Sequence, residues 1–319
     1  MKQKIKIGKK VIYYFIILIF CSSTSFAAYK KVGTTGAQFL KIGMGARPTG
    51  MGGSFVGLAD DVNAIWWNPA GLGQVKEKEV IATYLRWFQE INLGYLGYCF
   101  PSRKTGTFGA GITYLTLGNI PRTEIGANGN CIEKGSAFGA QDIALNLSYA
   151  NKIRKNLFIG VNIRTTQQKI DEKMCLQFMG DIGALYRLNS TGIGLMIQNI
   201  GSGIKFDRDT DPLPLDIKMG LAQKLFNKNL TVVIDINSPT VDNDINSNIG
   251  IEYLYKNIIA MRAGYNTTTA ENSNALSGIS AGFGFRLKSF GIDYAFVPYG
   301  KLGETHRFSL VMKFAKPTR

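Results

Sequence analysis

The stretch that decides the fold spans residues 43–72 and reads GMGARPTGMGGSFVGLADDVNAIWWNPAGL. Its first half is crowded with glycine: Gly43, Gly45, Gly50, Gly52, Gly53 and Gly57. Glycine has no Cβ, so it lets a backbone turn tightly or lie directly against other backbone. The second half carries two acids, Asp60 and Asp61, then Trp66, Trp67 and a turn-forming Asn68-Pro69-Ala70. These features favour a compact segment that packs inside something larger.

The glycines do not form a nucleotide-binding loop. The cluster Gly50-x-Gly52-Gly53 is not a complete G-x-G-x-x-G pattern, no strand precedes it, and no Lys-Ser/Thr pair follows as in a P-loop. A packing role is therefore the better interpretation, and we predict that this stretch is a hatch, a segment that plugs a barrel.

Downstream of the hatch, the sequence alternates between apolar and polar residues to its end. In residues 157–166, for example, Leu157, Ile159, Val161 and Ile163 alternate with Phe158, Gly160, Asn162 and Arg164. Such alternation is typical of β-strands with two different faces. It predicts fourteen strands, at 79–88, 92–100, 106–118, 138–150, 156–168, 175–187, 192–200, 214–225, 230–237, 247–255, 258–266, 276–287, 289–297 and 304–314.

The predicted connections support a membrane barrel. Short turns alternate with long loops, and the long loops are 119–137, 169–174, 201–213, 238–246, 267–275 and 298–303. Outer-membrane barrels have an even number of strands, short periplasmic turns and long extracellular loops. We therefore predict an all-β protein, a 14-stranded antiparallel transmembrane β-barrel with an N-terminal hatch. A soluble exported β-protein is the alternative fold.

The polar face of the predicted strands carries charges of both signs. We assign these to the barrel lumen: Arg164, Asp181, Arg187, Glu252, Arg262, Arg286 and Asp293. There they can pair across strands or contact the hatch, and Asp60 and Asp61 are expected to pair with lumenal arginines. Aromatic residues near strand ends, among them Trp87, Tyr95 and Tyr299, suggest girdles at the membrane interfaces.

The chain is predicted to have three parts. Residues 1–27 have the basic start, the short apolar run and the small residues before a cleavage site that define a secretory signal peptide. Residues 28–78 form the hatch, with short helices, and residues 79–319 form the barrel. No apolar run beyond residue 28 is long enough for a membrane-spanning helix. The predicted location is the outer membrane.

The composition argues against an enzyme, a cofactor and nucleic-acid binding. The only histidine is His306, and no C-x-x-C pattern exists, so catalytic triads and zinc sites are poorly supplied. The formal net charge is +15, but the basic residues are dispersed, which suits outer-membrane lipid headgroups better than nucleic acid. Two runs have calcium-like spacing without the rest of an EF-hand loop: Asp207, Asp209 and Asp211, and Asp242, Asp244 and Asn246. Solvated loops are the preferred interpretation, and no metal site is predicted.

Two cysteines fall at the ends of predicted long loops. Cys131 and Cys175 would lie on the same side of the barrel, in an oxidising compartment where disulfides form. A bridge between them is one hypothesis, and two free thiols are the other. Cys99 is expected to be a packed strand residue.

The hatch sequence resembles a known family. From Gly45 to Leu72 it is similar to the N-terminal signature of the PorV/PorQ family of outer-membrane proteins, whose pattern is close to GARALGMGGAFVALADDANALYWNPAGL. Pro48 and Ser54 stand where alanine is usual. The last strand also resembles a barrel-assembly signal, at Arg307, Ser309, Met312 and Phe314. These proteins are relatives of the long-chain fatty-acid transporter (FadL) barrels.

The resemblance implies a fourteen-stranded barrel with a lumenal hatch, in which Asn68, Pro69 and Ala70 match a hatch motif. It leaves two functions open. One is a passive channel for hydrophobic small molecules, with Phe55, Trp66 and Trp67 along an apolar path. The other is a binding scaffold for secreted proteins in a type IX-like secretion system, with loops 119–137 and 201–213 making the contacts. We further interpret Asn68-Pro69-Ala70 as the turn that leads from the hatch to the first strand.

Overall fold

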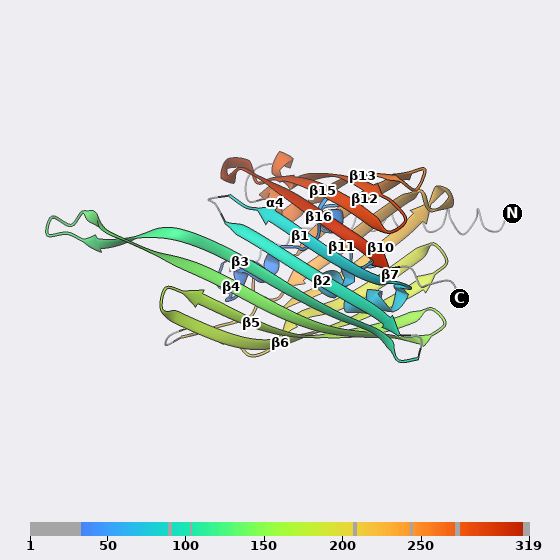
Figure 1. The fold of residues 1–319 in the computed structure, drawn as a ribbon, viewed down its shortest axis with the longest axis horizontal. Helices are drawn as coiled ribbons and strands as arrows, with labels where there is room; N and C mark the ends of the chain where they lie inside the picture. The colour runs from blue at the N-terminus through green and yellow to red at the C-terminus, as the bar shows by residue number, and fades with distance from the viewer. Residues whose placement is uncertain are drawn as a thin grey trace.

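The fold is a closed antiparallel β-barrel (Figure 1). It is described by a computed structural model at residues 33–88, 91–102, 104–206, 209–242, 245–271 and 275–314. The predicted signal peptide lies outside these residues. The barrel strands are β1 (Lys78–Arg86), β2 (Asn92–Ser102), β3 (Gly106–Ile125), β4 (Cys131–Arg154), β5 (Leu157–Ile170), β6 (Lys173–Leu188), β7 (Thr191–Ile200), β10 (Asp216–Leu225), β11 (Leu230–Pro239), β12 (Asn246–Tyr255), β13 (Ile259–Asn266), β14 (Ile279–Arg286), β15 (Phe290–Pro298) and β16 (Glu304–Phe314).

Each barrel strand pairs with its neighbours along the chain, and β16 closes the barrel by pairing with β1 from Lys78 opposite Phe314 to Arg86 opposite His306. The prediction of fourteen antiparallel strands is confirmed. A two-stranded sheet of β8 (Ile204–Lys205) and β9 (Thr210–Asp211) decorates the connection between β7 and β10. Among the described residues, no helix is long and apolar enough to cross a membrane.

The alternation predicted from the sequence sorts side chains between two environments. On β5, Ile159, Val161 and Ile163 point outward, and Ile163 is 66% exposed. Their neighbours Asn162 and Arg164 point inward, and Arg164 is fully buried. Lipid would cover the outward apolar band, while the inward face meets the protein's own interior.

The prediction of long loops at 119–137 and 169–174 is wrong. β3 and β4 continue through most of 119–137 and leave only 126–130 between them, whereas 169–174 shrinks to a two-residue turn at Asp171 and Glu172. The strand extensions carry polar residues on both faces. Alternation is required only where one face of a strand meets lipid, so strands outside the membrane escape a search based on it.

Residues 33–77 fill the lumen and are called the hatch below. The hatch contains η1 (Gln38–Lys41), α2 (Ala46–Thr49), α3 (Ala64–Trp67) and η2 (Pro69–Gln74). Short helices also lie in the barrel connections: η3 (Phe226–Lys228), α4 (Thr267–Glu271), η4 (Ala275–Gly278) and η5 (Gly300–Leu302). The main buried apolar cluster combines hatch residues such as Phe55, Leu58 and Ile65 with inward residues of the wall, so the core of this protein is the interface between hatch and barrel.

Candidate functional site: the hatch, the cavity beside it and the projecting arm

The hatch touches the barrel wall backbone to backbone. A Cβ added to Gly264 of β13 would lie 2.0 Å from the Gly52 nitrogen, and one added to Gly220 of β10 would lie 2.5 Å from the Gly57 nitrogen. Side chains at these wall positions would exclude the hatch. A Cβ added to Gly50 would lie 3.0 Å from the Gly282 Cα, and one added to Gly53 would lie 3.5 Å from the Asn248 amide nitrogen. The glycine pattern of the hatch therefore has a counterpart on the inward face of the wall.

The Asn68-Pro69-Ala70 turn lies within the hatch rather than at its exit. Asn68 caps η2 by accepting a hydrogen bond from the Ala70 nitrogen at 3.1 Å, and Pro69 occupies the first helical position. The Asn68 side chain also donates to the Val56 carbonyl at 3.0 Å. The helix continues to Gln74 before β1 begins. Asn68 thus joins two parts of the hatch.

Arg47 is the centre of a buried charge network. Its guanidinium donates to both oxygens of Glu252 on β12, at 2.9 and 2.8 Å, and to Asp60 and Asp61 at 2.7 and 2.6 Å. Asp60 also pairs with Lys224 of β10 at 2.6 Å. We expected lumenal arginines of the wall to pair with these acids, but the arginine that pairs with both is Arg47 of the hatch itself, and the wall contributes Lys224 to Asp60.

The charges of this network stabilise one another. Burial alone would raise the pKa of the Asp60 carboxyl, but Arg47 and Lys224 hold that pKa well below its ordinary value. Burial alone would lower the pKa of Arg47, yet Asp60, Glu252 and Asp61 keep it well above its ordinary value. Arg47 and Asp60 are therefore both stabilised in their charged forms, so the hatch is held to the wall by charge-assisted hydrogen bonds.

Sequence reasoning missed Arg47, although it lies inside the quoted stretch. The signal was available, because a single arginine in an otherwise uncharged glycine-rich segment needs an acidic partner once it is buried. Two acids of the wall also bind the hatch: Asp235, on the polar strand face expected to meet the lumen, and Glu79, which sequence reasoning passed over. Asp235 of β11 accepts from the Phe55 and Val56 nitrogens at 2.6 and 2.9 Å, and Glu79 of β1 accepts from the Val62 nitrogen at 3.0 Å.

The predicted lumenal charges form two clusters and one separate contact. In the first, Arg262 bridges Glu252 at 2.7 Å and Asp293 at 2.8 Å, and Arg286 lies 3.4 Å from Glu252. In the second, Arg164 pairs with Asp181 at 2.9 Å, both fully buried. Arg187 stands apart and donates to Gln74 of the hatch at 2.7 Å.

The tryptophans of the hatch face the second cluster and a cavity. The Arg164 guanidinium lies 4.9 Å from the ring centre of Trp66, and the Trp66 ring meets Tyr95 edge-on at 6.3 Å. Trp67 donates its indole N–H to the Met44 carbonyl at 2.8 Å. Phe55 was expected on an apolar path, but it is fully buried in the hatch with Arg47 5.3 Å from its ring centre.

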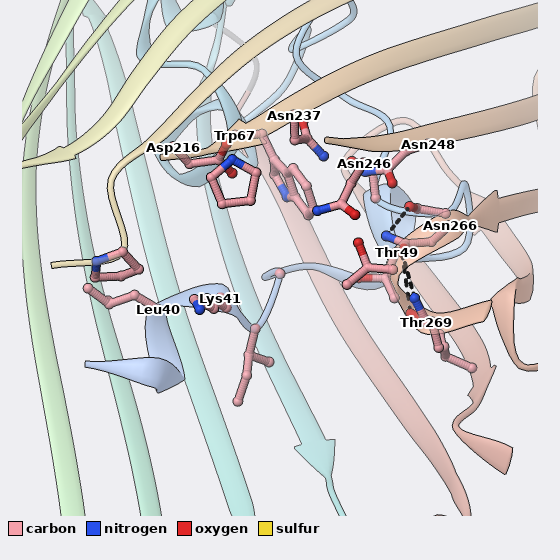
Figure 2. A pocket seen from close by; sticks show the side chains of 18 of the residues that line it. Leu40, Lys41, Thr49, Trp67, Asp216, Asn237, Asn246, Asn248, Asn266 and Thr269 are labelled. Carbon is pink, nitrogen blue, oxygen red and sulfur yellow. Dashed lines mark hydrogen bonds between the residues drawn. The ribbon is translucent and has the colours of Figure 1, made fainter. Parts of the chain in front are cut away.

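A cavity of about 450 Å³ lies on the long-loop side of the hatch. Trp66, Trp67, Gly43 and Gly53 contribute to it from the hatch, and the wall contributes residues near the long-loop ends of its strands. Figure 2 shows Asn237, Asn246 and Asn248 gathered beside Trp67, with Asn266 and Thr269 farther along the lining. Trp87 and Tyr299, placed by sequence in an aromatic girdle, line this cavity instead, with ring centres 5.0 Å apart. Tyr95, assigned to the same girdle, is also buried inside the barrel.

The hairpin of β3 and β4 projects far beyond the rest of the barrel (Figure 1). Pairing with β2 ends at Thr116 and pairing with β5 ends at Ala140. The hairpin therefore continues past its described neighbours to Ile125, a distance of about 30 Å at ~3.3 Å per residue. We call residues 118–139 the arm.

The proposed disulfide between Cys131 and Cys175 is wrong. Among the described residues both are free thiols, Cys131 exposed and Cys175 buried. Cys175 pairs with Gln168, which pairs with Asp142, whereas Cys131 lies at the far end of β4 in the arm. Eleven residues of strand separate Cys131 from Asp142, about 36 Å at ~3.3 Å per residue, whereas a disulfide needs Cα atoms within about 7 Å.

The acidic runs considered for calcium lie partly outside the described residues, at Asp207 and Asp244. Of the other members, Asp242 pairs with Lys41 of the hatch at 2.6 Å. Within the described part of the chain, no three His, Cys, Asp or Glu side chains group as a metal site would require.

A closed fourteen-stranded barrel with an outward apolar band and a filled lumen defines a plugged outer-membrane β-barrel. The family model described as "Type IX secretion system protein PorV" matches residues 25–238. The chain belongs to this family. A comparison with curated proteins finds no match.

Solved structures share the fold at low sequence identity. The toluene transporter TodX of P. putida is 14% identical, with a TM-score of 0.60 over 86% of this chain and 99% of TodX. A TodX deltaS2S3 mutant, described as a monoaromatic hydrocarbon channel, is 16% identical, with a TM-score of 0.57 over 86% of this chain and 99% of that one. At this level of identity the likeness concerns the fold alone.

Proposed function

We propose that this barrel is a non-enzymatic component of a secretion system that binds partner proteins at the cell surface through its long-loop rim. The observation that carries this proposal is the arm. A channel has no need for a hairpin that extends about 30 Å past its neighbouring strands, whereas a scaffold needs such a projecting surface.

The arm presents side chains rather than an open strand edge. Pro121 and two bulges interrupt its pairing, devices that discourage strand addition. At the tip, Ile125 is 82% exposed and Ile132 is 51% exposed, and they lie on adjacent strands next to Cys131. An apolar tip on a polar arm is a contact surface for another protein, because nothing on this chain's described residues covers it.

The hatch supports a closed resting state. Arg47, Asp235 and Glu79 connect hatch and wall at separate strands. Breaking the buried Arg47–Glu252 ion pair alone would cost about 3–5 kcal/mol, and Asp235 and Glu79 add hydrogen bonds to backbone N–H groups of the hatch. Movement of the hatch would break several such contacts together. The lumen is therefore better suited to staying shut than to passing solute.

Passive transport of hydrophobic molecules is the second candidate function. It is favoured by the fold shared with TodX, whose description names a hydrocarbon channel. The lining of the cavity counts against it, because an apolar solute would leave the amide groups of Asn237, Asn246 and Asn248 without partners.

Replacement of the arm tests the scaffold. Leu117 and Ala140 face each other across the hairpin, so an Asn-Gly turn can replace residues 118–139 and leave the remaining register intact. A photo-crosslinker at Ile125 should capture exported proteins in cells, whereas one at Phe226, which is 76% exposed at the opposite rim, should not. The arm-replaced protein should fold, shown by heat-modifiable gel mobility, yet fail to support delivery of those proteins to the surface.

Two results would refute the proposal. One is normal surface delivery by the arm-replaced protein. The other is rapid toluene entry into liposomes that contain the unmodified barrel, since this would establish the transport function instead.

A further inference from the structure

We propose that the cavity beside the hatch is a binding site for a neutral saccharide that enters from the long-loop side. The site is built around Trp67 by three asparagines from two neighbouring strands. Asn237 lies near the end of β11, and Asn246 and Asn248 begin β12 (Figure 2). The volume of about 450 Å³ falls within the range of small-molecule sites, roughly 300–1,000 Å³.

The amide groups in this site lack partners of their own. Asn248 is 3% exposed, and its Oδ1 has no hydrogen-bond partner among the described residues. Its Nδ2 reaches only the Gly53 carbonyl, at a long 3.5 Å. Within the same described part of the chain, the side chains of Asn237 and Asn246 make no hydrogen bond. Buried amides are normally satisfied, so the unpaired Asn248 oxygen at the cavity points to a ligand with a matching group, and the half-buried Asn237 and buried Asn246 offer further amides beside it.

The chemistry of the ligand follows from the lining. An amide offers two N–H donors and a carbonyl acceptor, and a sugar hydroxyl both donates and accepts, so vicinal hydroxyls suit a cluster of asparagines. The face of an indole ring is electron-rich and packs against the C–H face of a sugar ring. Trp67 supplies such a ring among the asparagines, with the Lys218 ammonium 5.9 Å from its centre. The Trp87 ring also lines the cavity but is already engaged by Arg307 and Tyr299.

The charges of the lining favour a neutral saccharide over an anionic one. Lys41 is paired with Asp242 at 2.6 Å, and Lys218 lies 3.4 Å from Asp216. Arg307 donates to Thr49 and stacks over Trp87, 5.7 Å from its ring centre. The cationic groups are thus engaged within the protein, which leaves the neutral amides to make the contacts.

Other ligand classes fit less well. A peptide in extended form is usually bound by addition to a sheet edge, and the walls of a closed barrel have no edge to offer. A hydrocarbon would satisfy Trp67 but not the asparagines.

The test uses the full-length barrel, purified in detergent, and neutral di- and trisaccharides of hexose and N-acetylhexosamine as probes. At least one should quench tryptophan fluorescence in a saturable manner, and Asn246→Ala and Asn237→Ala should each weaken binding about tenfold. Asn229→Ala is the matched control, an exposed asparagine at the opposite rim whose loss should leave binding unchanged.

Neither cavity variant removes a side-chain hydrogen bond found among the described residues, and heat-modifiable mobility checks that each barrel is folded. Three results would overturn the proposal: no neutral saccharide binds, binding survives both cavity variants, or only toluene or an extended peptide binds. The arm-replaced protein should still bind saccharide, so the failure of one proposal is distinguishable from the failure of the other.

Discussion

The hatch and the arm both lie outside the barrel wall, and they differ in almost every physical property. The hatch is packed inside the lumen, whereas the arm projects beyond the barrel. The hatch is glycine-rich, almost wholly buried and joined to the wall by charged hydrogen bonds. The arm is polar on both faces and largely exposed, and its two strands pair with each other while only Arg122 and Gly139 bond to Asp171 in the adjacent turn, among the described residues. Stability is therefore concentrated in the hatch, while the arm is free to carry contacts with other proteins. Substitutions in the two regions should separate folding from function.

Loss of the Arg47 guanidinium should produce the largest effect. Arg47→Gln leaves Glu252, Asp60 and Asp61 buried without their shared cation, which should cost about 3–5 kcal/mol of stability. The matched change in the arm is Arg122→Gln, which removes an ion pair with the half-exposed Asp171 and should cost less than about 1 kcal/mol. Urea unfolding of the purified barrels, followed by gel mobility, measures both. Equal costs would erase the contrast between the regions.

A methyl group inserted between hatch and wall should have the second-largest effect on stability. Gly264→Ala places a Cβ 2.0 Å from the Gly52 nitrogen and should destabilise the barrel by about 3 kcal/mol. Gly94→Ala is the control, because a Cβ there meets nothing within 4 Å. We expect protease to cleave the hatch in the first variant and not in the second. If the hatch of the Gly264→Ala variant still resisted protease, the wall would have to shift to accommodate the added methyl group.

Acid should loosen the hatch before it affects the arm. Since the folded pKa of Asp60 is depressed, its stabilisation is complete above the unfolded value of about 3.9 and declines as the pH falls below it. Pepsin digestion should find the hatch increasingly accessible below about pH 4. Asp60→Asn, which cannot titrate, should weaken the hatch at neutral pH and flatten this dependence. If pepsin sensitivity depended on pH in the same way in both proteins, protonation of Asp60 would not be the cause of the loosening.

The cap of η2 should contribute less. Asn68→Ala removes the hydrogen bond to the Ala70 nitrogen and the donor to the Val56 carbonyl, at a cost of about 1–2 kcal/mol. Liposome swelling should reveal a modest rise in solute leakage, with the barrel still folded. Leakage at the level of the unmodified protein would show that this turn does not help to hold the hatch closed.

The smallest change in stability belongs to the arm. Ile125→Ser with Ile132→Ser alters two exposed side chains and should shift the free energy of unfolding by less than about 0.5 kcal/mol. Crosslinking of exported proteins to a probe beside the tip should nevertheless fall sharply. Unchanged crosslinking would show that partner proteins bind elsewhere than at the tip.

The strand count and the inward position of Arg164, Glu252 and Arg262 could be predicted because lipid imposes a strict alternation on every membrane strand. The arm could not, because both of its faces meet water and nothing enforces the alternation. The sequence showed that a buried Arg47 needs acidic partners, but not which ones, since Arg47 comes near Asp60 and Asp61 only when the hatch folds back on itself.

The sequence by itself determined the barrel, the hatch and the family. Each of these can be read from patterns that span only a few neighbouring residues, namely clustered glycines and alternating polarity. Only the tertiary structure decided which wall glycines receive the hatch, which charges meet in the lumen, and that Asn237, Asn246 and Trp67 surround one cavity. These contacts join residues far apart in the chain, and closure of the barrel alone sets their register.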